Sequence, residues 1–378
     1  MFDRMMNQPQ NNPVLMPKNK NKTIKPGKKL PEPSLEHIKR LSDDTGLFEH
    51  AKFTIPLRRE GYTTDDNARA LIVTTKYYAL KRDAESLRLL DRYLAFVLHS
   101  QNSDGTVRNL MNFDRTWMRP EPDHDALGRV LWAFGTLLEK PPTTAHIHIA
   151  QEHLEISAPL IEKQSIRGKA YSILGLAGYL ARFPDADNMS ELTAKAADAL
   201  VTRYEQNSQP EWLWFEDVLT YDNAMLPCAL FTAAKTLNDR KYLEVAQKTC
   251  DFLLDNTFTG GPSTKLGAGH FSFVGCQGWF PRGGQKAQFD QQPIEAAGTI
   301  LMLDAAYKAT KDKKYLMLQQ KAFKWFLGGN DLGISLYDET SKGCGDGLGA
   351  GGVSANEGAE STLSFLLSLL TMRQDKCR

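Results

Sequence analysis

Six stretches of the chain join a polar or acidic cluster to an almost unbroken run of small apolar residues. The clusters lie at Asp65–Asp66, Asp123–Asp125, Arg167–Lys169, Asp222–Asn223, Asp290–Gln291 and Asn356–Glu357. A helix that is apolar on nearly every side must be surrounded by protein, and small side chains allow close packing. Each cluster also offers an N-cap residue or a proline for the first turn. The pattern therefore predicts six inner helices that begin with polar groups.

A second pattern alternates with the first. Residues 84–101 carry leucines and a valine at spacings of three and four, with charged residues on the opposite face, which is typical of an amphipathic outer helix. Similar segments start at Lys241 and Lys313. Each interval between clusters can hold one outer helix, one inner helix and a loop. Six such hairpins can close into a double ring, so we expect an all-α (α/α)6 toroid. Short β-hairpins in the loops are expected at FSFVGCQGWF and GISLYDE.

The first part of the chain differs from the rest. Residues 1–33 are rich in Asn, Gln, Pro and Lys and contain little apolar surface to bury. We expect them to form a flexible tail. Residues 34–378 are expected to form a single toroid domain.

Composition narrows the class of partner. Lys plus Arg number 46 and Asp plus Glu 45, which does not favour nucleic acid binding. The five cysteines are dispersed and form no C-x-x-C pair, as in proteins of reducing compartments. Neither a membrane-spanning apolar run nor a signal peptide is found, so we expect a cytoplasmic protein. Without zinc-site or nucleotide-binding motifs, we expect no metal and no cofactor.

The acidic clusters offer the chemistry of glycosidic bond hydrolysis, which needs two carboxyl groups facing each other across a sugar. Asp65 and Asp66 are adjacent, so one can cap the helix while the other points into a cavity with a raised pKa. The alternative is that both only cap. In the second cluster, His124 lies between Asp123 and Asp125 and could relay protons or bind a ligand.

The segment WLWFEDVLTYDNA mixes aromatic and acidic residues most densely. Aromatic faces stack on the C–H faces of pyranose rings, and carboxylates bind hydroxyl groups. The competing interpretation makes the tryptophans core anchors and leaves the acids solvated. A glycine-rich loop follows near Trp279 and could close over a ligand. The expected substrate-binding residues are Tyr62, Asp123, His124, Trp212, Trp214, Tyr221, Trp279, Arg282, Asp290, Gln291 and Glu357.

The motifs TTDDNARAL, DHDALGR, TYDNA, DQQPIEAAG and GAESTLSFLL resemble a family of helical toroid proteins associated with glycosyltransferase and mannoside-processing genes. More broadly, the chain is similar to the six-hairpin glycosidase superfamily, which includes endo-mannanases and unsaturated glucuronyl hydrolases. The resemblance implies that paired aspartates at inner-helix starts perform catalysis. Asp65, Asp66 and Asp125 match these in type and placement.

Three hypotheses follow for the function. The first is a glycoside hydrolase acting on an oligosaccharide, such as a mannose-containing one, with Asp66 and Asp125 as the catalytic pair. Asp65 would orient one of them, and Glu216 or Asp222 is the alternative base. The second is a sugar epimerase or isomerase of the same fold, for which His124 and His270 would move the proton. The third is a non-catalytic carbohydrate-binding partner of a glycosyltransferase.

Overall fold

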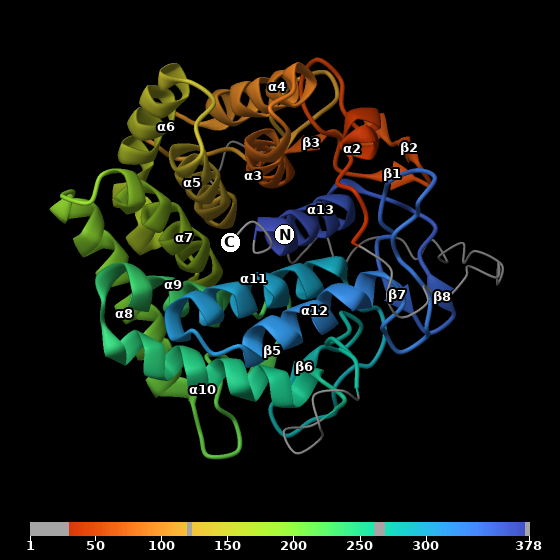
Figure 1. The fold of residues 1–378 in the computed structure, drawn as a ribbon. Coiled ribbons are helices and arrows are strands. Elements are labelled where there is room, and N and C mark those ends of the chain that lie inside the picture. Colours follow the sequence, from red (N-terminus) through yellow and green to blue (C-terminus); the bar gives the residue numbers. More distant parts are fainter. Residues whose placement is uncertain (1–29, 119–122, 261–268, 375–378) are drawn as a thin grey trace.

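The computed structural model describes residues 30–118, 123–260 and 269–374 (Figure 1). Residues 1–29, which make up most of the predicted tail, lie outside the described residues. The boundary between tail and toroid at residue 33 stays a prediction.

Six inner helices form a closed ring. Each one packs against the next, and the last packs against the first, which closes the circle (Figure 1). In chain order they are α3 (Thr64–Lys81), α5 (His124–Glu139), α7 (Ile166–Arg182), α9 (Met225–Leu237), α11 (Pro293–Thr310) and α13 (Ala359–Gln374). All six predicted inner helices are confirmed.

A second layer of helices covers the ring from outside. Each of α4, α6, α8, α10 and α12 packs on the inner helix that precedes it, and the short α2 packs on α13. Their bounds are α4 (Ala84–Ser100), α6 (Thr144–Ser157), α8 (Asp187–Asn207), α10 (Arg240–Thr257), α12 (Lys314–Phe326) and α2 (Glu36–Arg40). The double ring is the (α/α)6 toroid that the alternating pattern predicts.

Glycines bring α5 and α7 unusually close together. A Cβ atom on Gly135 would lie 2.1 Å from the carbonyl oxygen of Gly175, and one on Gly128 would lie 2.4 Å from that of Gly168. Even alanine would push the two helices apart at these positions. The small residues of the inner runs therefore set the spacing of the ring.

Short antiparallel strand pairs lie in the loops between the helices. The pairs are β1 (Ala51–Lys52) with β2 (Ile55–Pro56), β3 (Tyr62–Thr63) with β4 (Leu110–Met111), β5 (Val218–Leu219) with β6 (Phe280–Pro281), and β7 (Leu348–Gly349) with β8 (Gly352–Val353). Of the two segments expected to form hairpins, FSFVGCQGWF supplies the first residue of β6, and GISLYDE makes isolated bridges only. Strands of two residues carry too little alternation to be read from a sequence.

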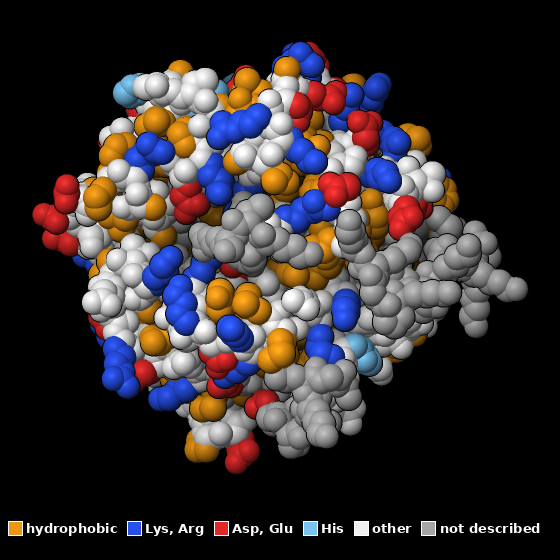
Figure 2. All heavy atoms as spheres, in the orientation of Figure 1, with side chains coloured by type: hydrophobic (Ala, Val, Ile, Leu, Met, Phe, Trp, Pro, Cys, Tyr) orange, Lys and Arg blue, Asp and Glu red, His pale blue; other side chains and the backbone are white. Residues whose placement is uncertain are grey.

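The surface mixes charges of both signs. Figure 2 shows Lys and Arg side chains interspersed with Asp and Glu over the face that it presents. This distribution agrees with the near balance of charges in the sequence. In the part of the chain that the structure describes, no helix is long and apolar enough to cross a membrane.

Candidate active site

The polar clusters lie at or next to the starts of the inner helices, which share one opening of the ring that we call the mouth. The Thr63 hydroxyl caps α3 by accepting a hydrogen bond from the Asp66 N–H (3.0 Å). Asp123 caps α5 by accepting from the N–H groups of Asp125 and Ala126, and Ser165 caps α7. Capping thus accounts for Asp123, while Asp65 and Asp66 lie in the first turn of α3.

Arg69 gathers three carboxyl groups at the start of α3. Its Nη2 lies 3.0 Å from Asp65 Oδ2, and its Nη1 lies 3.2 Å from Asp66 Oδ1 and 2.7 Å from Glu360 Oε2. Glu360 belongs to the first turn of α13, so this cluster joins two neighbouring inner helices. Arg69, Asp65 and Asp66 are all buried.

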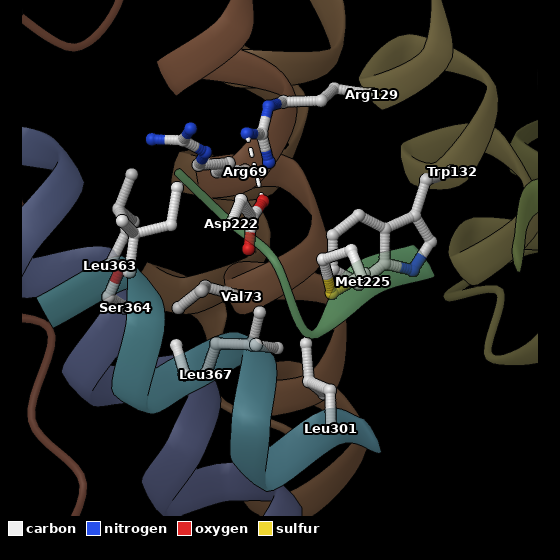
Figure 3. A pocket seen from close by; sticks show the side chains of 13 residues that line it. Arg69, Val73, Arg129, Trp132, Asp222, Met225, Leu301, Leu363, Ser364 and Leu367 are labelled. Atoms are coloured by element: carbon white, nitrogen blue, oxygen red, sulfur yellow. Dashed lines mark hydrogen bonds and ion pairs between the residues drawn. The ribbon is translucent and has the colours of Figure 1, made fainter. Parts of the chain in front are cut away.

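Arg129 extends the network across the ring (Figure 3). Its Nε pairs with Asp65 on α3, and its Nη2 lies 3.2 Å from Asp222 Oδ2 and donates to the Tyr171 hydroxyl (2.8 Å). The Tyr171 hydroxyl in turn donates to Asp222 (2.6 Å), and the guanidinium lies 4.0 Å from the Tyr171 ring centre. One buried arginine therefore links α3, α5, α7 and the segment before α9.

The acids around Arg69 differ in the direction of their pKa shifts. Burial is the main cause that raises the pKa of Asp66 from 3.8 to about 8; Arg69 acts in the opposite direction, and repulsion from Asp65 and Glu360 adds to the rise. Burial also raises the pKa of Asp65. The pKa of Glu360 is lowered, because Arg69 and Arg129 outweigh its burial. A neutral carboxyl group therefore stands beside an ionised one at neutral pH.

A second cluster forms where α5, α7 and the segment before α9 meet. Arg167 donates to both Glu216 oxygens (3.2 and 2.9 Å) and to the Tyr221 carbonyl (2.7 Å). The Tyr221 hydroxyl donates to Asp125 (3.1 Å), whose other oxygen accepts from Ser165. Asp125 is half-buried, so its carboxylate reaches the mouth while remaining oriented by two hydroxyl groups.

Glu295, in the first turn of α11, fixes the backbone before α9. Its carboxyl oxygens accept from the Asp222 N–H and from the Asn223 amide (3.0 Å). Burial and the nearby Asp222 raise the pKa of Glu295 to about 8. Asp222 has a positive φ of 47°, so Glu295 holds a backbone conformation that few residues adopt freely.

Asn109 bridges the starts of α3 and α5. Its side-chain oxygen accepts from the Asp65 N–H (3.1 Å), and its amide donates to Asp123 Oδ2 (2.9 Å). The Asn109 backbone carbonyl also accepts from Thr64 N–H (2.8 Å). The relative position of the two acidic helix starts is thus held by one amide group.

Below the network the ring axis is nearly filled. Arg69, Arg129 and Asp222 form the polar end of a cavity whose other walls are mostly apolar (Figure 3). The free volume is about 20 Å³, which is room for about one water molecule. This cavity is therefore too small for any ligand much larger than water.

Several residues that the sequence predicted as ligand contacts lie instead in packed or bonded positions. Trp212 is 4% and Trp214 0% exposed, and both pack against Phe252, as in the core-anchor interpretation. Tyr62 is buried, with its hydroxyl bonded to Asp43. Gln291 is buried and accepts from Trp325 Nε1 (2.9 Å).

The remaining predicted contacts lie on loops and helix starts. Glu357 is buried beside His37, and burial raises its pKa to about 7. Arg282 pairs with Asp217 (2.8 Å). Trp279 and Asp290 are half-buried, and both have positive φ values. Among the described residues, none of these four side chains bonds with Arg69 or Arg129.

The two histidines expected at the mouth are not brought together. His124 is exposed at the start of α5. His270, in the loop before α11, has its Nε2 2.9 Å from Oδ1 of Asp331, which follows α12. Within the described ranges, no group of three or more His, Cys, Asp or Glu side chains is arranged to hold a metal ion.

The arginines at the centre of the site were not predicted. Their signal is present in the sequence, because an aspartate precedes an arginine by four residues both at Asp65 to Arg69 and at Asp125 to Arg129. Each arginine also interrupts an otherwise apolar run. A charged residue in a buried helix needs a partner, so these positions could have been read as part of the site.

Comparison with known proteins supports the fold. No protein-family model and no curated protein sequence matches the chain. A D-mannose isomerase structure has a TM-score of 0.67 at 13% identity and covers 90% of this chain and 94% of its own. A cellobiose 2-epimerase from Bacillus thermoamylovorans has a TM-score of 0.64 at 13% identity, covering 88% and 96%. A GH76 α-mannanase from Bacteroides thetaiotaomicron has a TM-score of 0.64 at 13% identity, covering 90% and 93%.

At these identities the likeness shows the fold alone. It confirms the (α/α)6 toroid and, at the level of fold, the resemblance to six-hairpin glycosidase-like proteins.

Proposed function

We propose that the protein is a glycoside hydrolase that cleaves an uncharged oligosaccharide at the mouth of the ring. The observation that carries the proposal is the contrast between Asp66 and Asp125. Asp66 is buried with its pKa raised to about 8, whereas Asp125 is half-buried and held by two hydroxyl groups. Two carboxyl groups in unlike environments on neighbouring helices fit the roles of acid and base.

In this mechanism Asp66 is the general acid. Its proton passes to the glycosidic oxygen as the bond to the leaving sugar breaks. Asp125 acts on the opposite side of the ring of the sugar, as the base that activates water or as the nucleophile. Asp65 does no proton transfer, because Arg69 and Arg129 hold both its oxygens.

Glu216 and Asp222 are the alternative bases, and their contacts favour a positioning role. Asp222 is 2% exposed and is held by Arg129 and the Tyr171 hydroxyl. Glu216 receives two hydrogen bonds from Arg167. Asp125 accepts from neutral hydroxyl groups and is open to the mouth, so it is the better placed base.

The charges of the network favour an uncharged sugar. Arg69, Arg129 and Arg167 each already pair with at least one carboxylate. A uronate or phosphate would have to displace one of these carboxylates or enter a site with surplus negative charge. A mannose-containing oligosaccharide, which the motif resemblance suggests, meets this requirement.

Hydrolysis is tested with a panel of neutral oligosaccharides of mannose, glucose and galactose. The purified protein should release new reducing ends from at least one of them, and Asp66→Asn prepared in parallel should not. Asp251→Asn, the same exchange on outer helix α10, should retain activity. Failure to cleave any member of the panel, with binding intact, would support instead a carbohydrate-binding partner of a glycosyltransferase, and co-purification of such an enzyme would test that role.

Epimerisation or isomerisation is the second candidate, and His50 is the observation that favours it. His50 lies in the loop before β1, where its Nε2 is 3.5 Å from Glu49 Oε1, and it is near Glu360 and Asp346. An imidazole beside carboxyl groups can carry a proton to and from carbon. Uptake of deuterium from heavy water into a free sugar, with no new reducing ends, would select this reaction over hydrolysis.

The proposed setting is the cytoplasm. The described cysteines Cys228, Cys250, Cys276 and Cys344 are all free thiols, as is usual in a reducing compartment. Fractionation of cells that produce the protein would test this location.

A further inference from the structure

The turn between β1 and β2 holds a phenylalanine in an unusual backbone conformation. Ala51 pairs with Pro56 and Lys52 with Ile55, so Phe53 and Thr54 form the two-residue turn. Phe53 has a φ of 56°. Turns of this kind favour Gly, Asn or Asp, because a larger side chain is strained at positive φ. A phenylalanine here is not explained by the needs of the turn.

Packing does not explain the phenylalanine either. Its side chain is 41% exposed, although phenylalanine is among the residues most often buried. The neighbouring Ile55 is 63% exposed. The chain thus accepts a strained backbone and leaves an aromatic face open to solvent.

The turn is fastened to the start of α13. The Phe53 N–H donates to Asn356 Oδ1 (2.8 Å), and the Phe53 carbonyl accepts from the Glu357 N–H (2.9 Å). Just below, the Glu49 carbonyl accepts from the Ala359 N–H (3.1 Å). These bonds fix the place of the aromatic ring relative to the helix.

The same stretch of α13 belongs to the arginine network. Glu360 directly follows Ala359 and pairs with Arg69 at 2.7 Å. The β1–β2 turn therefore lies on the rim of the mouth, next to the cluster that contains Asp66. Figure 1 shows β1 and β2 at the edge of the ring.

We infer that Phe53 is the aromatic platform of an outer sugar subsite, where its exposed face stacks on the C–H face of a pyranose ring. This inference rests on the proposed function and names a binding residue for it. Strain at a residue clamped beside a site is the signature of a functional constraint. A stacking platform also needs no hydrogen-bond partner, in agreement with an open phenylalanine. Because the turn is at the rim, the platform contacts a sugar unit beyond the one at the acids.

The test measures binding of mono- and trisaccharides of mannose, glucose and galactose by calorimetry. All variants are made in the Asp66→Asn background, so that no sugar is consumed. Phe53→Ala and Phe53→Asn remove the platform, Phe53→Trp keeps it, and Leu80→Ala is the matched control. Leu80 is also 41% exposed but lies near the opposite end of α3.

For the trisaccharide that binds, Phe53→Ala and Phe53→Asn should raise Kd by roughly three- to tenfold, as expected for loss of one aromatic contact. Monosaccharide Kd should change by less than about twofold, because the platform lies outside the central subsite. Phe53→Trp and Leu80→Ala should bind like the parent. Phe53→Asn should also keep or raise Tm, since Asn accepts a positive φ more readily.

Unchanged trisaccharide binding in Phe53→Ala would overturn the inference and leave the proposed function standing. An equal loss for both sugar sizes together with a lower Tm would overturn it in favour of a structural role. A dimer that dissociates in Phe53→Ala would assign the ring to self-association. If the parent binds no sugar of the panel, the proposed function fails, and the inference fails with it.

Discussion

The starts of α3 and α5 carry the same motif in opposite environments. Each has an aspartate four residues before a buried arginine, Asp65 before Arg69 and Asp125 before Arg129. At the start of α3, Asp65 is buried and paired with Arg69. At the start of α5, Asp125 lies at the mouth and accepts hydrogen bonds from two hydroxyl groups. The same spacing therefore places Asp65 in a buried ion pair with two arginines and leaves Asp125 half-buried, held by two hydroxyl groups. Burial, more than the motif, assigns the role.

The largest expected effect is on kcat, and changing the leaving group of the substrate should distinguish the roles of Asp66 and Asp125. Asp66→Asn and Asp125→Asn should each lower kcat on the natural sugar by roughly 10²- to 10⁴-fold. With an aryl glycoside whose leaving group needs no proton, Asp66→Asn should recover most of its rate and Asp125→Asn should not. The check is steady-state kinetics of both variants on both substrates, with Asp251→Asn as control. Recovery by Asp125→Asn instead would reverse the two roles.

Removing Arg129 should damage the link between the two regions. Arg129→Met leaves Asp65 and Asp222 buried without that partner, so we expect a loss of about 3 to 5 kcal/mol in the free energy of unfolding. Urea denaturation measures it. Arg240→Met, at a side chain that is 88% exposed, is the matched control. If Arg129→Met loses no more free energy of unfolding than the control, the contacts of Arg129 do not stabilise the fold.

The raised pKa of Asp66 predicts a pH dependence of stability. Its folded pKa of about 8 exceeds the ordinary value of 3.8, so the native state keeps a proton that the unfolded chain releases. Stability should therefore fall as pH rises between these values, by at most about 1.4 kcal/mol per pH unit for this group. Asp66→Asn should flatten the slope.

Asp114→Asn provides the control for that slope. The Thr116 hydroxyl and N–H lower the pKa of Asp114, so it titrates below the window in which Asp66 acts. Urea unfolding from about pH 5 to about pH 8 should therefore show the wild-type slope for this variant. Equal slopes for Asp66→Asn and wild type would remove Asp66 as the neutral acid.

The smallest expected effect concerns the bridge between the two helix starts. Asn109→Ala removes the acceptor for Asp65 N–H and the donor to Asp123, which should cost about 1 to 2 kcal/mol of stability. Asn112→Ala is the comparison, because its amide bonds Thr116 within its own turn. If both variants lose the same stability in urea, Asn109 does not couple the two starts.

The ring could be predicted from the sequence because it depends on local pattern. Apolar runs with small residues give inner helices, and amphipathic segments give outer ones, whichever partner each finds. The polar starts of the inner helices then share one end of the ring. The positions of Asp65, Asp66 and Asp125 at the starts of α3 and α5 follow from this pattern.

The bonds of the site could not be predicted, because they join residues that meet only in the closed ring. Arg129 and Asp222 are 93 positions apart, and Arg69 and Glu360 are 291 apart. The prediction that Trp212 and Trp214 contact a ligand depended on their aromatic character alone. The same local sequence also allows them to pack in the core, where they lie. Phe53 was missed because its strain is visible only in the backbone.

We propose that Asp66 at the mouth is a neutral carboxyl group at neutral pH. A carbon-13 NMR titration of labelled aspartate side chains measures this directly, with Asp66→Asn identifying the signal. We expect a midpoint near pH 8 for Asp66. A midpoint below about 5, within the usual range for aspartate, would contradict it.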